Sequence, residues 1–249
     1  MFKTLFLFSI LSFLALTSFK RNIYKRNKTY VYDAFYIKSN GDTLTKETII
    51  LQPKGRPWIF QFSQTAYKVT YNPQNDSLEN WIDPVNKHQQ FREQMKQSAI
   101  KQGVEWVDHW VVESRSGAVE NKTEVWTHPF RSNQYNLTEI APFPEVDRNK
   151  LYKDSVWHTG FILGWDNWQG TIDNEYKVIR QKNYQYKKTS LKNCWEIIAS
   201  GKHSNPKLGV NYNHYLFHTK YGFVELNYTF YNGVKIHFKL KEIIYKKSK

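Results

Sequence analysis

Apolar and polar residues alternate with a period of two along most of this chain, a pattern that indicates β-strands with one face on a core. β-branched and aromatic residues fill the alternating runs, and Gly, Asn, Ser and Pro separate them. The runs lie at 29–37, 46–52, 58–71, 105–113, 122–127, 156–163, 175–187, 194–200, 210–218, 222–231 and 234–241. We therefore expect a mainly β fold with a large antiparallel sheet.

The clearest pair of strands surrounds the dipeptide Asn232-Gly233. Every second residue from Val224 to Phe230 and from Val234 onward is apolar, whereas the residues between them are polar. This alternation indicates a sheet that is covered on one face only. An Asn-Gly dipeptide between two such runs predicts a two-residue turn in which both residues take a positive φ.

One segment, 86–101, has the period of a helix instead. Phe91, Met95 and Ala99 recur every four residues along a thin apolar stripe. Pro84 before the segment and Gly103 after it suit a helix start and stop. We expect this helix to lie on or across the sheet.

The N-terminus carries an apolar run from Leu5 to Leu16 that only two serines interrupt. A bilayer-spanning helix needs about 20 residues, so the run has the length of a signal-peptide core. We expect a signal peptide at 1–18 and a single domain at 19–249, exported to the periplasm or the extracellular space. The basic residues from Lys20 to Lys28 favour the alternative of an uncleaved N-terminus held in the membrane.

The single cysteine, Cys194, excludes an intramolecular disulfide, and it lies too far from the N-terminus to serve as a lipoprotein cleavage site. We expect no lipid anchor, and we interpret Cys194 as a small buried hydrophobic residue.

A formal net charge of +14 suggests a polyanionic partner. Export argues against nucleic acid, so the expected partner is an anionic envelope surface. The positive charge is spread along the chain, however, and this favours a solvated lysine-rich surface as its explanation.

The common catalytic, cofactor and paired-cysteine zinc motifs are absent. His214 and His218 fall on one face of a predicted strand but about 13 Å apart, too far to share a metal ion. We therefore predict no catalytic residues, no metal and no cofactor.

Two loops and one strand carry the candidate ligand-binding residues. The loop after the strand 122–127 contains an imidazole and a guanidinium, the loop 164–170 contains two indoles between glycines, and the strand near 58–62 has three rings on one face. The candidates are Trp58, Phe60, Phe62, His128, Arg131, Trp165 and Trp168. Ordinary loop contacts, a cap over an open sheet end and a hydrophobic core are the structural alternatives.

Four short motifs occur in a fixed order. They are Glu-Val-Trp-Thr-His-Pro-Phe-Arg (124–131), Leu-Thr-Glu-Ile-Ala-Pro-Phe-Pro-Glu-Val (137–146), Gly164-Trp165 with Trp168, and Cys-Trp-Glu-Ile (194–197). Together they resemble a poorly characterised group of exported Bacteroidota proteins related to the TapB-like and LolA-like half-barrels. The resemblance covers about residues 29–245. It implies a large curved antiparallel sheet, or half-barrel, with a helix over its concave side, and it implies no activity.

Our leading hypothesis is a noncatalytic envelope protein that holds an apolar ligand, such as a lipid or a lipid-modified partner, inside the incomplete barrel. An aromatic content of 17% motivates it. One alternative is a hydrolase of an envelope polymer, with His128 and either Asp108 or Glu139 as acid and base. Another is a surface-interaction protein for anionic glycans. An apolar cavity under the 86–101 helix would favour binding, whereas a cleft with converging histidine and carboxylate would favour the enzyme.

The N-terminal pattern makes a direct prediction about processing. Mass spectrometry of the protein from its native host should find an N-terminus near Ser18 or Phe19, in an envelope or secreted fraction. A chain with Met1 intact in the cytosol would contradict export.

Overall fold

The computed structural model describes residues 23–55, 64–71, 97, 106–107, 110–111, 113–164, 168–187 and 189–246. Its main strands are β1 (Lys28–Ile37), β2 (Thr43–Gly55), β3 (Gln64–Tyr71), β6 (Glu113–Glu120), β7 (Glu124–Thr127), β8 (Glu145–Asp147), β9 (Val156–Leu163), β10 (Gly170–Tyr186), β11 (Thr189–His203), β12 (Val210–His218), β13 (Gly222–Thr229) and β14 (Lys235–Tyr245). A separate short pair is β4 (Trp106–Val107) with β5 (Trp110–Val111), and three 3₁₀ helices are η2 (Asn133–Ile140), η3 (Arg148–Lys150) and η4 (Pro206–Leu208).

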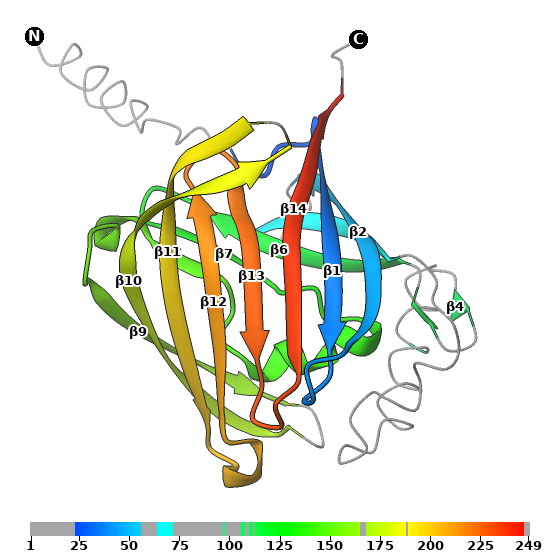
Figure 1. Cartoon of the computed structure of the whole chain (residues 1–249), viewed down its shortest axis with the longest axis vertical. Helices are drawn as coiled ribbons and strands as arrows, with labels where there is room; N and C mark the ends of the chain where they lie inside the picture. The colour runs from blue at the N-terminus through cyan, green and yellow to red at the C-terminus, as the bar shows by residue number, and fades with distance from the viewer. Residues whose placement is uncertain are drawn as a thin grey trace, which may run out of the picture.

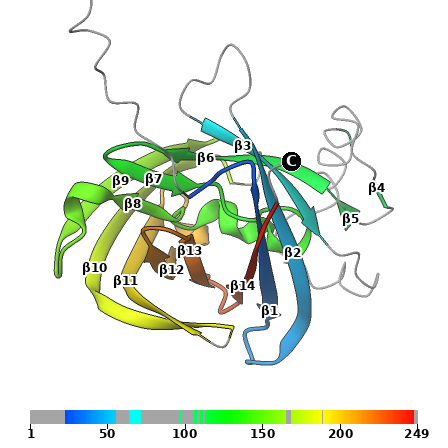
Figure 2. The ribbon, with the colours of Figure 1, turned by 90° about the horizontal axis from the view of Figure 1, so that it is seen from above.

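The twelve main strands form one antiparallel sheet in the order β8-β7-β6-β3-β2-β1-β14-β13-β12-β11-β10-β9. The sheet curves into a nearly closed barrel (Figure 1). Seen from above, it curls far enough that β7 and β8 lie near β9 and β10 (Figure 2). The two end strands, β8 and β9, do not pair with each other. The expected single, curved, antiparallel sheet is confirmed.

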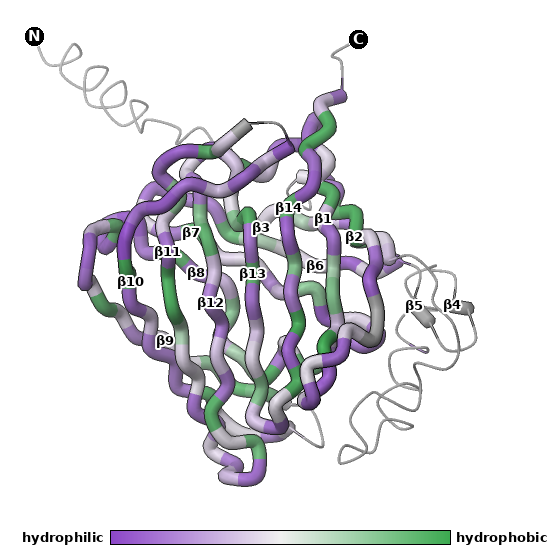
Figure 3. The backbone as a smooth tube through the Cα atoms, in the orientation of Figure 1, coloured by the Kyte–Doolittle hydropathy of each residue, from purple (hydrophilic) through white to green (hydrophobic). Residues whose placement is uncertain are grey.

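Alternate residues of most strands point into the barrel, so hydrophobic and hydrophilic positions alternate along β14 (Figure 3). Tyrosines dominate the interior: the largest fully buried side chains include Tyr30, Tyr67, Tyr71, Tyr135, Tyr176, Tyr215 and Tyr228. A buried tyrosine needs a partner for its hydroxyl group. Tyr32 illustrates how this need is met, because its hydroxyl donates to the Phe223 carbonyl at 2.9 Å.

The barrel interior is occupied by the chain itself. Seven of the eight residues of η2 are buried. The segment that follows η2 is held by side chains on the inner face of β10 and β12. Asn211 donates a hydrogen bond to the Ile140 carbonyl at 3.0 Å, and Asn213 donates to the Pro142 carbonyl at 3.1 Å. The Tyr176 hydroxyl donates to the Phe143 carbonyl at 3.2 Å, and the Tyr215 hydroxyl donates to the Glu145 carbonyl.

Most predicted strands are found, with ends shifted by a few residues. The sequence pattern missed β6, whose Glu-Ser-Arg-Ser-Gly stretch reads as a loop, and β8, which has only three residues. The predicted helix 86–101 lies outside the described residues except for Gln97, which is helical. Cys194 is fully buried, and burial raises the pKa of its thiol to about 11, which confirms its interpretation as a core residue.

The turn between β13 and β14 differs from the predicted one. The Gly233 N–H donates to the Phe230 carbonyl at 2.9 Å, and the Phe230 N–H donates to the Val234 carbonyl at 2.9 Å. Gly233 has φ +81°, but Asn232 does not have a positive φ. The two-residue turn was therefore wrong: the loop has three residues and ends on one left-handed glycine, which is another common hairpin connection.

Replacing Gly233 by Val should lower the free energy of unfolding by about 1 kcal/mol or more, because a β-branched residue resists this φ. A Cβ atom here would also lie 3.0 Å from the Ser39 Cβ. The measurement is urea unfolding. Gly164→Val is the control and should change stability far less, since Gly164 has no positive φ and a Cβ atom added to it would meet no other atom within 4 Å. Gly233→Val with unchanged stability would contradict this account of the turn.

Candidate functional site: a cleft between the two ends of the sheet

A cleft of about 480 Å³ lies where the two ends of the sheet approach each other. We call it the seam cleft. One wall comes from β7, β8 and the segment around η2, namely Glu124, Trp126, His128, Arg131, Glu139, Phe143 and Glu145. The other wall comes from β9 and β10, namely Thr159, Gly160, Phe161, Ile162, Leu163, Asn174 and Tyr176.

Strand periodicity decides which side chains of β7 and β8 reach this cleft. Val125 and Val146 pair with each other and are buried in the core. Their neighbours Trp126 and Glu145 also pair with each other, and they point to the opposite face because strand side chains alternate. That opposite face forms the wall of the seam cleft.

A row of aromatic rings crosses the cleft from β7 to β9. Ring centroids are 5.1 Å apart for Trp126 and His128, 5.3 Å for His128 and Phe143, and 4.6 Å for Phe143 and Phe161. The buried Nδ1 atom of His128 has no hydrogen-bond partner. Burial, helped by the charge of Arg131, lowers the His128 pKa to about 4. The imidazole is therefore neutral at pH 7 and serves as part of the ring surface.

The carboxyl groups of the cleft differ in their surroundings. Glu139 is buried and accepts a hydrogen bond from the Arg131 guanidinium at 2.8 Å. Burial raises the pKa of Glu139, and Arg131 opposes that rise. Burial, and then the nearby carboxylate of Glu124, raise the pKa of Glu145 to about 7. Glu145 can therefore donate a hydrogen bond near neutral pH, when part of it is protonated.

Asn174 brings an unpaired amide to the β10 wall. It is 2% exposed, and neither its Oδ1 nor its Nδ2 has a hydrogen-bond partner. Gly201 lies opposite it on β11, and a Cβ atom there would come within 2.6 Å of the Asn174 Oδ1. A buried polar group without a partner costs about 1–3 kcal/mol. A ligand in the cleft that supplied a donor and an acceptor would remove that cost.

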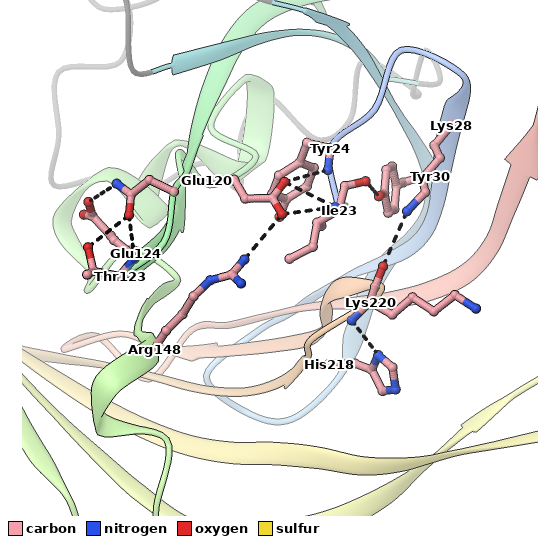
Figure 4. Close-up of polar contacts among 11 residues, drawn as sticks. Ile23, Tyr24, Lys28, Tyr30, Glu120, Thr123, Glu124, Arg148, His218 and Lys220 are labelled. Carbon is pink, nitrogen blue, oxygen red and sulfur yellow. Dashed lines mark hydrogen bonds and ion pairs between the residues drawn. The ribbon is translucent and has the colours of Figure 1, made fainter. Parts of the chain in front are cut away.

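A second buried carboxylate holds the β7–β8 end of the sheet in place (Figure 4). Glu120, at the end of β6, is 1% exposed. It accepts from the N–H groups of Ile23 and Tyr24 at 3.2 and 3.3 Å, and it pairs with Arg148 at 3.3 Å. Because Arg148 directly follows β8, this ion pair ties the short end strand to β6 and to the start of the described chain.

The structure brings together two of the seven sequence candidates, His128 and Arg131, which both line the seam cleft. Trp168 is buried in the core instead, and its carbonyl lies 3.0 Å from the Nε2 of His203. The remaining candidates, Trp58, Phe60, Phe62 and Trp165, lie outside the described residues, as does Asp108. Their ligand-binding role stays a prediction.

Most residues of the cleft were not singled out from the sequence, among them Phe161, Asn174 and Glu145. Asn174 carried a usable signal, because it is a polar residue at the same parity as the apolar Ile172 and Tyr176. Glu145 carried none, since β8 is too short for its alternation to be recognised.

Within the described parts of the chain, no group of three or more His, Cys, Asp or Glu residues is placed to hold a metal ion. No helix in those parts has the length and apolar character needed to cross a membrane.

The raised pKa of Glu145 predicts a pH dependence of stability. The unfolded carboxyl ionises near pH 4.5 and the folded one near pH 7, so its stabilising contribution is complete below about pH 4.5 and is lost as the pH rises through 7. Glu145→Gln cannot ionise. Its free energy of unfolding, relative to wild type, should therefore rise by on the order of 2–3 kcal/mol between about pH 4 and pH 8.

Urea titrations across this pH range measure the difference in free energy of unfolding between Glu145→Gln and wild type. His128 is present in both proteins, so its opposite pH dependence cancels in this difference. Glu175→Gln, at an exposed position of β10, is the control and should show no such rise. A pH-independent difference for Glu145→Gln would show that this carboxyl is not shifted.

Comparisons with known proteins give matches in structure alone. No family model matches the chain, and no curated protein matches it significantly. A Bacteroides fragilis protein described as exported and YmcC-like in fold has 7% identity and a TM-score of 0.43, over 89% of this chain and 97% of that one. A Parabacteroides distasonis protein described as a lipoprotein has 9% identity and a TM-score of 0.44, over 89% and 96%. The hypothetical lipoprotein YmcC of Escherichia coli has 7% identity and a TM-score of 0.32, over 97% of each chain.

These structural neighbours are thus described as exported or as lipoproteins, and two of the three descriptions name YmcC, at low sequence identity. None of the three descriptions mentions TapB or LolA, so that finer resemblance stays a prediction. Similarity at this level assigns no activity to the chain.

Proposed function

We propose that the protein is a noncatalytic component of the cell envelope that binds an apolar ligand, such as a lipid or a lipid-modified partner, in the seam cleft. The observation that carries this proposal is the combination, in one cleft, of a row of aromatic rings with the unpaired amide of Asn174. Ligand sites typically have volumes of about 300–1,000 Å³, with apolar walls and a few polar groups. The seam cleft has this size and this composition.

The proposed location of the ligand differs from our expectation from sequence. We expected the ligand inside the barrel, but η2 and the residues after it fill much of that space. The seam cleft remains open because β8 and β9 do not pair. Each acyl methylene buried there would contribute about 0.8 kcal/mol, so a short chain already supplies measurable affinity.

The proposed envelope location rests on the apolar run from Leu5 to Leu16.

A hydrolase is the second candidate, because His128 and two carboxyl groups, Glu139 and Glu145, line the same cleft. Against it, Glu139 is engaged by Arg131, and no hydrogen bond joins His128 to a carboxyl group among the described residues. Incubation with envelope polymers isolated from the native host distinguishes the two. Release of soluble fragments that stops in His128→Ala would favour the enzyme.

Binding of a fluorescent fatty acid tests the proposed function. Phe161→Ala should weaken binding about tenfold, because it removes a ring from the cleft wall and with it about 1–2 kcal/mol of apolar contact. Ile198→Ala is the control, since Ile198 is 42% exposed and lies outside the cleft lining. The measurement is a fluorescence titration, together with mass spectrometry of lipids extracted from protein purified from the native host.

Equal binding by wild type, Phe161→Ala and Ile198→Ala would place the fatty acid elsewhere. Absence of both probe binding and co-purified lipid would contradict the lipid form of the proposal.

A further inference from the structure

The two edge strands of the sheet, β8 and β9, differ in how their unpaired backbone groups are covered. An end strand exposes a row of backbone N–H and C=O groups, which proteins usually cover, interrupt or flank with charge to prevent pairing with another chain. At the β8 end, the Glu145 carbonyl accepts a hydrogen bond from the Tyr215 hydroxyl, and three carbonyls of the segment that leads into β8 accept from Asn211, Asn213 and Tyr176. Side chains thus cover the start of β8.

The β9 end has none of these protections. Its eight residues, Val-Trp-His-Thr-Gly-Phe-Ile-Leu, include no proline, lysine, arginine or carboxylate. It pairs with β10 in continuous register, without a bulge, from Val156 to Leu163. Among the described residues, its backbone makes no hydrogen bond other than those to β10. β9 is thus a regular strand without lysine, arginine or carboxylate, and one of its two edges, which we call the free edge, has no backbone partner among the described residues.

That free edge faces the seam cleft. Five successive residues of β9, from Thr159 to Leu163, line the cleft. Side chains of a strand alternate between its two faces, so a surface formed by side chains of one face would include only every second residue. Here consecutive residues line the cleft and one of them is a glycine, which indicates that the backbone edge of β9 faces the cleft. The opposite wall of the cleft comes from β7, β8 and the segment around η2.

The polar groups of the cleft indicate the chemistry of a chain that pairs with this edge. Glu124 and Glu145 add carboxyl groups to this cleft, while Arg131 is engaged by Glu139. In a protein with a net charge of +14, this local excess of acidic groups favours a basic residue on the ligand.

We infer that the free edge of β9 pairs with an extended peptide segment of another protein, one that carries apolar residues and a basic residue and enters the seam cleft. The added strand would satisfy the backbone groups of β9 and place its apolar side chains against Trp126, Phe143 and Phe161. This inference rests on the proposed function, because it names the partner of the same cleft.

Selection of a displayed random dodecapeptide library on the purified full chain tests the inference. Enriched peptides should alternate apolar and polar residues and carry lysine or arginine. Their synthetic, fluorescein-labelled forms are then titrated by fluorescence anisotropy. Methylation of every second backbone nitrogen keeps the side chains but removes the donors, and it should lower affinity about tenfold or more.

Variants of β9 provide the matched test on the protein. Successive N–H groups of a strand point to opposite neighbours, and proline has no N–H group. Of the two variants Thr159→Pro and Gly160→Pro, one therefore removes an N–H group from the free edge, and the other removes a hydrogen bond to β10. Thermal unfolding identifies the edge variant as the more stable of the two. It should lose peptide binding, whereas Ile198→Ala, which lies outside the cleft lining, should keep it.

The outcomes separate the two proposals. If the wild type binds the fatty acid, but no selected peptide binds the wild type more tightly than the edge variant, the inference is overturned and the proposed function stands. Peptides that bind equally well when N-methylated would also overturn it. A concentration-dependent dimer that the edge variant abolishes, seen by sedimentation, would replace the peptide by a second copy of this chain. Loss of both peptide and fatty-acid binding in wild type would remove the cleft as a ligand site.

Discussion

A curved sheet that does not close into a barrel has two edge strands with unpaired backbone groups, and its interior must be filled. This constraint shapes the rest of the molecule. The chain meets it by passing the segment after β7 through the barrel. Amide and hydroxyl groups of Asn211, Asn213 and Tyr176 bind the carbonyls of this segment, where sheet hydrogen bonds would otherwise be needed. Side chains thus satisfy the backbone carbonyls of the segment that leads into β8.

The interior is correspondingly polar for a β-barrel core. Tyrosines supply much of its volume, and their hydroxyl groups reach backbone carbonyls, as those of Tyr32 and Tyr176 do. Such a network stabilises one arrangement of the inner segment, because a shift of the segment would leave several buried donors without acceptors at about 1–3 kcal/mol each. The Glu120–Arg148 ion pair fixes the other side of the short β8 strand.

The seam cleft follows from the same constraint. Since β8 is tied inward and β9 continues the outer wall, the two ends overlap without pairing and leave a gap between them. Aromatic rings from both ends meet across this gap, and Asn174 faces it without a partner. The molecule is therefore closed on one side of the seam and open on the other, and binding is proposed at the open side.

The sequence by itself determined the local features: the fold class, most of the strands, the apolar faces of β13 and β14 and the burial of Cys194. Each depends on a period of two or on residue type, both of which can be read within a few residues. The sequence also pointed to His128 and Arg131 through the residue types of one loop. It could not reveal the three-residue β8, or β6 with its polar residues, because neither has enough alternation to be recognised.

Only the tertiary structure decided where the cleft lies. Trp126 and Phe161 come from strands at opposite ends of the sheet order, and they meet through Phe143 because the sheet curls round on itself. The free state of the β9 edge depends on which strands pair, and the unpaired state of Asn174 depends on what lies across the barrel from it. Periodicity is a local property, whereas strand pairing and closure depend on contacts between residues far apart in the chain.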